Sequence, residues 1–279
     1  MPEGPEVQTV VNALNHAVVG KILSGCVILD TAKLPEGIPA DEFQRRIQGQ
    51  QIVSAHRRGK YLNIELTSGD CIVIHLMMTG HLELIHPGGT NPRFTRLVLH
   101  FADGAALCFV DLRRFGVATL LRPDQMATYK GFQNLGVDIY ADDFTLANFA
   151  PIFDSRRKIH TLLLDQSLVS GLGNIYVNET LFQAGIHPLR IANTLTEAEI
   201  ERLYQAAREI TQEALRQLGT SFSAYRSIDG GEGRYQNLLR VFQRENEPCL
   251  RCGAVIERVK IGGRSAFYCP QDQPLLSAI

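Results

Sequence analysis

A change of sequence texture near Asp138 constrains the fold more than any other feature. Before it, β-type runs are separated by turn signals such as TSGD and ADGA; they are KILSGCVILD, QIVSAH, YLNIEL, CIVIHLM, RLVLHF, ALCFVDL and VATLL. Runs of this length with such turns predict hairpins in a sandwich or barrel. After Asp138 the spacing becomes helical, most clearly in TEAEIERLYQAAREITQEALRQL. We therefore expect an α+β fold.

Length and composition set the number of domains. The chain has 279 residues, a length that suggests two domains with a small appendage. Because 45% of the residues are hydrophobic, it can bury a sizeable core. No stretch approaches the ~18 consecutive apolar residues of a membrane span. Acidic residues stand at the N-terminus where a secretory signal has basic ones, which indicates a cytoplasmic protein. We place the domains at residues 1–133, 134–225 and 226–279.

The chain begins MPEGPE, and a helix is predicted directly behind this motif. Helical spacing is seen for the apolar residues Val7, Val10, Val11, Leu14 and Val18. Pro2, Glu3 and Glu6 therefore stand at the start of a helix. Removal of Met1 would turn Pro2 into a free secondary amine, but a Met-Pro start by itself usually carries no chemical meaning.

The charge distribution is more informative than the net charge of −1. Basic residues occur in short clusters, and residues 226–264 hold eight basic and five acidic side chains, a local net charge of +3. A basic stripe on a neutral protein can bind nucleic acid. Ordinary solvated faces would explain the same clusters, so charge alone leaves both interpretations open.

The cysteines fall into two groups. Cys26, Cys71 and Cys108 lie in apolar strand-like runs and are predicted to be buried free thiols. The second group has metal-ligand spacing and consists of Cys249, Cys252, Cys269 and, three residues on, Asp272. Three thiolates and one carboxylate can hold zinc in a small β-hairpin. The alternative is a hairpin held by packing and hydrogen bonds alone.

Five segments, taken together, resemble the formamidopyrimidine-DNA glycosylase family, the Fpg/Nei group; they are MPEGPE, RRGKYL, DLRRFG, LLLDQSLVSGLGNIYVNE and GGRSAFYC. The resemblance covers nearly the whole chain in the family's order. It implies an N-terminal catalytic β-sandwich with a leading helix, a helix–two-turn–helix DNA-binding domain and a C-terminal zinc-finger-type hairpin. It further implies a monomeric base-excision-repair DNA glycosylase and AP lyase that carries one zinc ion. The damaged double-stranded DNA is expected to bind between the sandwich and the helical part.

The resemblance assigns the catalytic roles. Pro2 matches the nucleophile that attacks C1′ of a damaged nucleotide, and Glu3 matches the proton-transfer residue. Lys60 matches a lysine that binds phosphate beside the lesion, and Arg264 matches the finger arginine that serves the second elimination. An α-amine suits the nucleophile because its pKa is about 7.7–8.0, against about 10.4 for lysine.

DNA-binding roles are implied for Glu6, Met78, Arg113, Phe115, Arg156 and Asn174. Met78, Arg113 and Phe115 match side chains that fill the space left when a base is everted, a step that costs a few kcal/mol. Without the resemblance, Met78 and Phe115 would be assigned to the core. Glu6 is expected to organise the start of the first helix. Asn174 can cap a helix and contact phosphate there, next to a glycine-rich turn.

Some positions depart from the family pattern. Phe94 stands where some relatives have a DNA-binding histidine, and His160 replaces a lysine, which predicts a weaker, pH-dependent phosphate contact. MMTG and DLRRFG favour the branch that removes oxidised purines, namely 8-oxoguanine and formamidopyrimidines. The alternatives are a Nei-like glycosylase for oxidised pyrimidines, a non-catalytic DNA-binding relative, and a tautomerase that uses Pro2 as a base.

Overall fold

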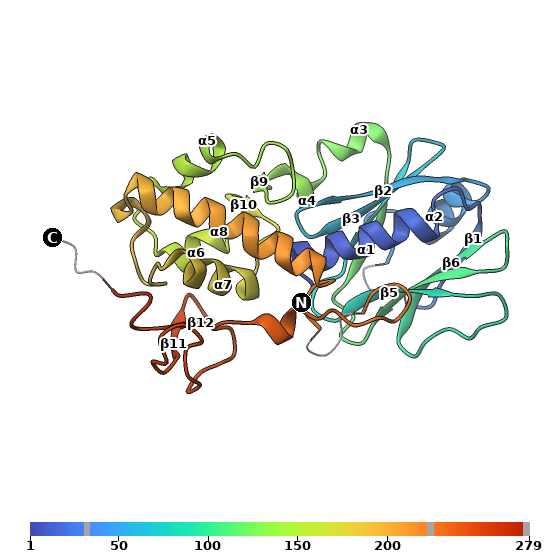
Figure 1. Ribbon diagram of the computed structural model, residues 1–279. Coiled ribbons are helices and arrows are strands. Elements are labelled where there is room, and N and C mark those ends of the chain that lie inside the picture. Colours follow the sequence, from blue (N-terminus) through green and yellow to red (C-terminus); the bar gives the residue numbers. More distant parts are fainter. Residues whose placement is uncertain (31–33, 222–225, 276–279) are drawn as a thin grey trace. The chain divides into compact units, whose positions relative to one another are not determined.

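The computed structural model describes residues 1–30, 34–221 and 226–275. The chain divides into two compact units, one of residues 1–133 with 217–236 and the other of residues 134–216 with 237–279 (Figure 1). The α+β class predicted from the sequence is confirmed. Within the described ranges, no helix has the length and apolar character needed to cross a membrane.

The first unit is a β-sandwich with a leading helix, as predicted. Its helices are α1 (Gly4–Ala17), α2 (Ala40–Ile47), α3 (Pro123–Met126) and α4 (Lys130–Gln133). Its strands are β1 (Leu23–Ile28), β2 (Ile52–Arg58), β3 (Tyr61–Leu66), β4 (Cys71–His75), β5 (Gly80–Ile85), β6 (Thr95–Phe101), β7 (Ala106–Asp111) and β8 (Val117–Leu121). They form two antiparallel four-stranded sheets, in the orders β1-β6-β7-β5 and β2-β3-β4-β8.

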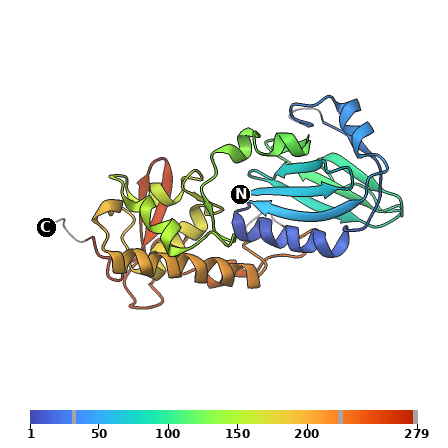
Figure 2. The same ribbon diagram turned by 90° about the horizontal axis from the view of Figure 1, so that it is seen from above.

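One hydrophobic core joins both sheets to α1 and α2. Helix α1 runs alongside the strands (Figure 2) and contributes five apolar side chains that are at most 3% exposed, namely Val7, Val10, Val11, Leu14 and, at its C-cap, Val18. These are the positions that the helical spacing identified. Strand β5, with sequence GHLELI, was not predicted, because its polar residues interrupt the apolar run that marks the other strands.

The second unit is mainly helical. Its elements are β9 (Val137–Asp138), α5 (Leu146–Phe149), η1 (Ala150–Phe153), α6 (Ile159–Leu163), β10 (Val169–Ser170), α7 (Asn174–Ala184), η2 (Ala192–Thr194), α8 (Glu197–Arg216), β11 (Glu257–Ile261) and β12 (Arg264–Tyr268). A further short helix, η3 (Tyr235–Leu238), spans the end of the 217–236 segment. Strands β11 and β12 form an antiparallel hairpin. Helix α7 packs on β12, so the helical part supports the hairpin (Figure 1).

The segment 217–236 packs with the first unit although it follows α8 in sequence. The Leu84 backbone N–H donates to the Ile228 carbonyl at 2.7 Å, and the Ile228 side chain belongs to the sandwich core. The boundary placed between residues 225 and 226 lies inside this segment. The three-domain division stays a prediction.

Candidate active site

The first helix begins at a cluster of buried acidic and backbone groups. Pro2 is buried, Glu3 is 3% exposed and Glu6 is 1% exposed. One carboxylate oxygen of Glu6, Oε2, accepts the Glu3 backbone N–H at 2.8 Å, and Oε1 accepts the Thr220 N–H at 2.7 Å. The Glu6 carboxylate thus ties the start of α1, which carries Pro2 and Glu3, to the 217–236 segment.

Gly219 allows this close approach. Its φ is +80°, a left-handed conformation that favours glycine. A Cβ added there would lie 2.8 Å from Cγ and Oε1 of Glu6. The Glu6 carboxylate therefore has room only because residue 219 has no side chain.

Lys60 lies in the tight turn between β2 and β3 and is only 7% exposed. The Arg57 guanidinium holds this turn: Nη1 donates to the Gly59 carbonyl at 2.6 Å, and Nε donates to Oε1 of Gln8 on α1 at 3.1 Å. The turn that carries Lys60 is thereby fastened to the helix that carries Pro2. Burial, together with the Lys60 charge, lowers the pKa of His75 to about 4, so this neighbour is neutral at physiological pH.

The three residues matched to the DNA wedge lie in loops and are exposed. Met78 is 43% exposed and Phe115 is 40% exposed, while Arg113 stacks its guanidinium 4.8 Å from the centroid of the Phe115 ring. Large apolar side chains are more often buried in the core than exposed. Because Met78 and Phe115 are exposed, neither is a core residue. A cation over an aromatic face is a favourable contact that holds the pair together.

Buried Asp111, at the end of β7, fixes the loop that carries Arg113 and Phe115. Its carboxylate accepts the Gly116 N–H at 2.7 Å and the Arg113 N–H at 3.2 Å, and it also accepts the hydroxyl of Thr79, next to Met78. Sequence analysis assigned no role to Asp111, because the partners that give it one come from two separate loops.

Buried Arg96 completes the network from strand β6. It is 2% exposed, its Nη1 lies 3.5 Å from Oδ2 of Asp111, and the same nitrogen donates to the Gly116 carbonyl at 3.1 Å. A buried charge is stable only when it is paired and hydrogen-bonded, and here both conditions hold for the two ions. The loop geometry is therefore set by a buried ion pair.

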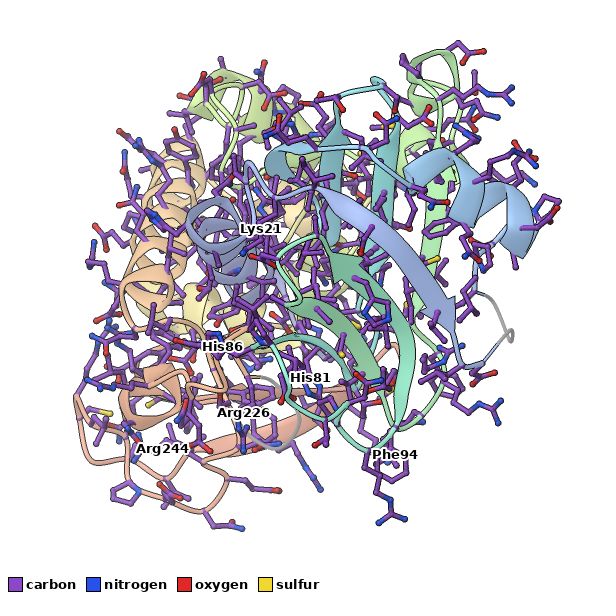
Figure 3. The ribbon with its side chains drawn as sticks, turned by 90° about the vertical axis from the view of Figure 1, so that its right-hand side faces the viewer. Lys21, His81, His86, Phe94, Arg226 and Arg244 are labelled. Atoms are coloured by element: carbon purple, nitrogen blue, oxygen red, sulfur yellow. The ribbon has the colours of Figure 1, made fainter. Side chains whose placement is uncertain are left out.

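Phe94 departs from the family pattern and keeps an unusual conformation. Its φ is +68°, it is 44% exposed, and the Arg93 guanidinium lies 4.5 Å from its ring centroid. Figure 3 shows Phe94 at one end of the β-rich unit, pointing away from the ribbon. Its ring offers an apolar surface where a histidine would offer a hydrogen bond.

In the second unit, helix α7 holds the finger hairpin and the segment before it through the side chains of Asn174, Asn178 and Glu179. Asn174 Nδ2 donates to the Ser265 carbonyl at 3.0 Å, and Asn178 Oδ1 accepts the Phe267 N–H at 2.6 Å. The fully buried Glu179 carboxylate accepts three backbone N–H groups at 2.9–3.0 Å, from Arg240, Val241 and Phe242. Asn174 and Arg264 both line a cavity of about 530 Å³.

Arg264 is exposed directly after a two-glycine turn. Gly262 and Gly263 have φ values of +56° and +78°, as a type I′ hairpin turn requires. Arg264 pairs with Ile261 across the hairpin. Arg156 is also exposed, in the loop before α6, whereas its neighbour Arg157 pairs with Asp165 at 2.7 Å.

His160 does not occupy the place expected of a phosphate contact. It is 0% exposed, and its Nε2 lies 3.1 Å from Oδ1 of Asn174. Burial lowers its pKa to about 4. The prediction of a weaker, pH-dependent phosphate contact at His160 is wrong, because a buried neutral ring cannot reach a phosphate or titrate near neutral pH.

The four predicted metal ligands gather at one point of the finger. Their donor atoms all lie within 4.8 Å of one another. Sγ of Cys249 is 3.0 Å from Oδ2 of Asp272, and the sulfur atoms of Cys252 and Cys269 are 3.4 Å apart. Donors about 2.3 Å from a tetrahedral zinc ion stand about 3.8 Å from one another, so the set fits zinc.

Backbone groups around these sulfur atoms favour thiolates. The Arg251 N–H donates to Sγ of Cys249, and the Asp272 N–H donates to Sγ of Cys269, each at 3.4 Å. Burial raises the pKa of Cys269 to about 12, so a thiolate there needs a cation beside it. A bound metal lowers thiol pKa values by direct ligation. The donor set supports one zinc ion per chain.

The remaining cysteines are buried free thiols, as predicted; they are Cys26, Cys71 and Cys108. Burial raises their pKa values to about 11, 12 and 11, respectively, which makes them unreactive.

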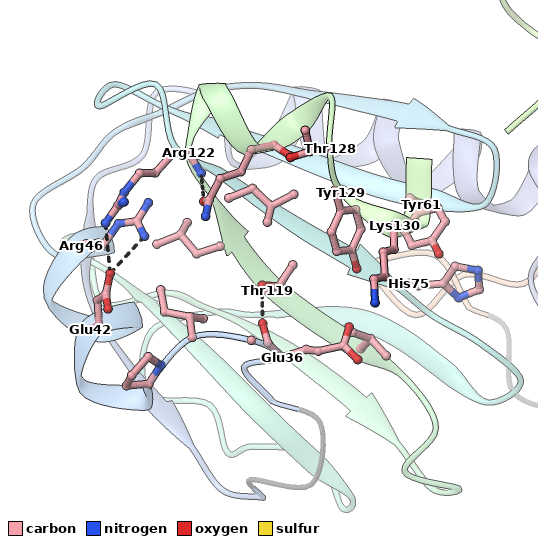
Figure 4. A pocket seen from close by; sticks show the side chains of 18 of the residues that line it. Glu36, Glu42, Arg46, Tyr61, His75, Thr119, Arg122, Thr128, Tyr129 and Lys130 are labelled. Atoms are coloured by element: carbon pink, nitrogen blue, oxygen red, sulfur yellow. Dashed lines mark hydrogen bonds and ion pairs between the residues drawn. The ribbon is translucent and has the colours of Figure 1, made fainter. Parts of the chain in front are cut away.

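A cavity of about 930 Å³ in the first unit is lined by none of the predicted site residues. Figure 4 shows Tyr61, His75, Tyr129 and Lys130 toward one end of it, and the ion pairs of Glu42 with Arg46 and Arg122 toward the other. The predicted site residues thus lie outside this cavity.

A β-sandwich with a proline before its first helix, together with a helical unit that carries a four-donor finger, defines the class of helix–two-turn–helix proteins with a C-terminal zinc finger. Family models match in the same order. Residues 1–118 match the formamidopyrimidine-DNA glycosylase N-terminal domain, residues 135–225 its H2TH domain, and residues 246–275 the zinc finger found in FPG and IleRS.

Full-length relatives agree with these matches. The chain is 40% identical to a formamidopyrimidine-DNA glycosylase of Synechocystis sp., with 99% of each chain covered. It is also 40% identical to that of Pelotomaculum thermopropionicum, covering 98% of this chain and 99% of the relative. The chain belongs to the formamidopyrimidine-DNA glycosylase family.

Solved structures show the same fold. A Lactococcus lactis FPG mutant in complex with a Fapy-dG containing DNA superimposes with a TM-score of 0.90, at 33% identity, covering 98% of this chain and 100% of that one. The L. lactis Fpg in complex with an abasic site containing DNA gives a TM-score of 0.89, at 33% identity, with coverage of 98% and 99%.

Proposed function

We propose that this protein is a base-excision-repair enzyme, a DNA glycosylase with AP lyase activity, that removes 8-oxoguanine and formamidopyrimidines from double-stranded DNA. The observation that carries the proposal is the start of α1. There, the Glu6 carboxylate holds the backbone of buried Glu3, directly after Pro2, and the Lys60 turn is fastened to the same helix through Arg57 and Gln8. The full-length relatives are formamidopyrimidine-DNA glycosylases, and the solved structures with the same fold are Fpg proteins in complex with DNA.

Pro2 is the nucleophile in this proposal. After Met1 is removed, the lone pair of the Pro2 nitrogen attacks C1′, and the bond from C1′ to the damaged base breaks. The electron pair of that bond leaves with the base, which takes up a proton. The Pro2 nitrogen then gives its N–H proton to the Glu3 carboxylate. Opening of the sugar ring, with Glu3 delivering this proton to the ring oxygen, gives an iminium between Pro2 and C1′. A secondary amine suits this step, because its iminium has no N–H to lose.

The same iminium drives strand cleavage. It withdraws electrons from C2′, so loss of a proton there expels the 3′-phosphate by β-elimination. A second, δ-elimination expels the 5′-phosphate, and hydrolysis of the iminium returns the Pro2 amine. Lys60 and Arg264 bind the phosphates flanking the lesion, and their positive charges stabilise the departing anions.

The exposed loops of the first unit serve base eversion. Met78 and Phe115 fill the gap in the stack, and Arg113 donates hydrogen bonds to the base left unpaired. Arg156 and the amide of Asn174 bind phosphate, the latter at the start of α7 where a helix terminus favours an anion. Cys249, Cys252, Cys269 and Asp272 would hold zinc, whose part is structural: it closes the hairpin that carries Arg264.

Three further properties belong to the proposal. The protein acts as a monomer in the cytoplasm of its cell, as expected of a DNA-repair enzyme without a membrane-spanning helix in the described residues. Residues 1–133 carry catalysis, residues 134–225 bind DNA through the helix–two-turn–helix element, and residues 226–279 form the finger.

A nicking assay across a panel of lesion duplexes tests this function. Duplexes would contain formamidopyrimidine, 8-oxoguanine, an oxidised pyrimidine or an abasic site, each in the same sequence. We expect the oxidised purines and the abasic site to be cut fastest, with phosphate left on both sides of the gap. Preferential cutting of the oxidised pyrimidine would assign the protein to the Nei-like branch. If none of the duplexes were cut, the protein would instead be a non-catalytic DNA-binding relative.

A further inference from the structure

The buried histidine of α6 has a contact that the proposed chemistry does not use. His160 is 0% exposed, and its Nε2 is 3.1 Å from Oδ1 of Asn174. The other end of the same amide, Nδ2, donates to the Ser265 carbonyl of β12 at 3.0 Å. His160, Asn174 and Ser265 thus form a continuous chain from α6 through α7 to the finger hairpin, next to Arg264.

The direction of each hydrogen bond in this chain follows from the groups present. The Ser265 carbonyl can only accept, so the Asn174 amide must turn its NH₂ toward the finger. Its oxygen then faces His160, whose Nε2 must carry a proton in order to donate. The other ring nitrogen, Nδ1, is buried and has no hydrogen-bond partner. A neutral ring with its proton on Nε2 is the form that satisfies this arrangement.

We propose that His160 is a positioning residue, which holds the Asn174 amide in one orientation and thereby sets the finger strand that presents Arg264. This proposal rests on the proposed function, because Arg264 matters through its grip on DNA phosphate. One of the two amide hydrogens of Asn174 binds Ser265, and the second is left to donate to a phosphate at the start of α7. A flipped amide would present its oxygen to that phosphate and to the Ser265 carbonyl.

The surroundings keep the ring neutral. A second proton would fall on buried Nδ1, where no acceptor lies, and the positive charge of Arg264 from β12 opposes it. Asn174, from α7, offers its oxygen only to Nε2. A lysine at this position would bring a charge, whereas His160 supplies a neutral donor of fixed direction.

The first test requires no DNA. Long-range ¹H–¹⁵N NMR of protein labelled with [¹⁵N]histidine reports the tautomer of each ring, and His160→Gln identifies the signal of His160 by its loss. We expect the Nε2–H tautomer, with no titration between pH 8 and pH 5. A ring protonated on Nδ1, or one that titrates near pH 6.5, would overturn the proposal whether or not the protein repairs DNA.

The second test measures affinity for a duplex that contains a tetrahydrofuran abasic-site analogue. His160→Leu removes the donor at similar volume, whereas His160→Gln keeps an N–H close to the position of Nε2. We expect His160→Leu to weaken binding about tenfold, in line with the loss of one oriented hydrogen bond, and His160→Gln to restore most of it. Zinc content and thermal midpoint serve as folding controls for both variants.

The Asn174→Ala variant shows whether His160 acts through Asn174 or independently of it. If His160 acts through Asn174, adding His160→Leu to Asn174→Ala should cost no further affinity. An additional tenfold loss in that background, or equal binding by the wild type and the His160→Leu variant, would overturn the positioning role. A wild-type protein that fails to bind the duplex would instead refute the proposed function, while the NMR result would still decide the tautomer.

Discussion

Buried carboxylates orient the candidate active site at the scale of single residues. Glu6 accepts two backbone N–H groups, from Glu3 and Thr220, and Asp111 accepts a further two in the loop of Phe115. Both carboxylates are about 1% exposed. Such groups contribute little net energy while paired, but they are costly to leave half-satisfied.

Glu6→Gln tests this role. The amide keeps one acceptor oxygen, so either the Glu3 or the Thr220 N–H would face an NH₂ group and lose its partner. We expect the free energy of unfolding to fall by about 1–3 kcal/mol, and nicking of an abasic duplex to slow as the start of α1 loosens. Urea denaturation followed by circular dichroism measures the first effect, since the chain has no tryptophan.

Asp41→Asn is the matched control, because Asp41 is an exposed carboxylate in the first turn of α2. It should change the free energy of unfolding by less than about 0.5 kcal/mol. Gly219→Ala should reproduce the Glu6→Gln defect from the opposite side of the contact. Equal stability of wild type and Glu6→Gln would show that the Glu6 carboxylate is dispensable.

Residues differ in how well their place and role can be predicted from the sequence. The motif positions could be placed because their neighbours in sequence are also their neighbours in space, as for Glu3 and Glu6. Arg96 and Asp111 could not, because their pairing joins strand β6 to the end of β7. His160 was misplaced for the same reason: the contact that buries it comes from Asn174, 14 residues away.

At the scale of elements, apolar periodicity predicted α1 and seven strands but not β5. Strand β5 has half-buried alternation, and Gly80, His81 and Glu83 break the run that would mark it. The finger was predicted from cysteine spacing alone, and spacing sufficed because the hairpin register brings Cys269 back toward Cys252. The anchoring of this hairpin on α7 by Asn174 and Asn178 depends on tertiary contacts and has no local signal.

The prediction that the finger binds zinc depends most on Asp272. Asp272→Ala removes one of four zinc donors, so we expect zinc occupancy below one per chain and slower nicking. Asp272→Cys should bind zinc more tightly than the wild type, since a thiolate is the softer ligand. Elemental analysis of protein purified without chelator, followed by competition with a colorimetric chelator, measures both effects.

Gln271→Ala, at an exposed neighbouring position, should leave zinc content unchanged. Acid should release zinc from the wild type, because protonation of the ligands competes with the metal. Full nicking activity in wild-type protein with no measurable zinc would mean that packing alone holds the hairpin.

Across the whole molecule, two histidines with lowered pKa values, half-buried His75 and buried His160, predict the pH dependence of stability. The pKa values of His75, in the first unit, and His160, in the second, are lowered by burial to about 4 each, against about 6.5 in an unfolded chain. The unfolded state therefore binds more protons between these values. The stabilisation is complete above about pH 6.5 and is lost as the pH falls towards 4.

Urea unfolding between pH 8 and pH 5 checks this expectation. The free energy of unfolding should decline below about pH 6.5 in the wild type, and less so in a variant that combines His75→Asn with His160→Gln, which cannot titrate at either position. Identical pH profiles for the two proteins would contradict the lowered pKa values of these two rings.

Binding of DNA by both units predicts a strong salt dependence. Lys60 and Arg113 belong to the first unit, and Arg156 and Arg264 to the second. If each of these four cationic side chains neutralises a phosphate or lies directly beside one, the slope of log affinity against log salt is about −3.6, at about −0.9 for each side chain. Arg156→Ala should reduce the slope by about 0.9. A nearly flat dependence would show that these four side chains do not lie at the DNA backbone.

The central claim is that Pro2 is the nucleophile, and trapping the iminium tests it most directly. Borohydride would be added to the protein with an abasic-site duplex, and the covalent complex would be digested and sequenced by mass spectrometry. The account predicts that Met1 is absent and that the reduced DNA adduct is attached to the nitrogen of Pro2. An adduct on Lys60, or an active preparation that retains Met1, would contradict it.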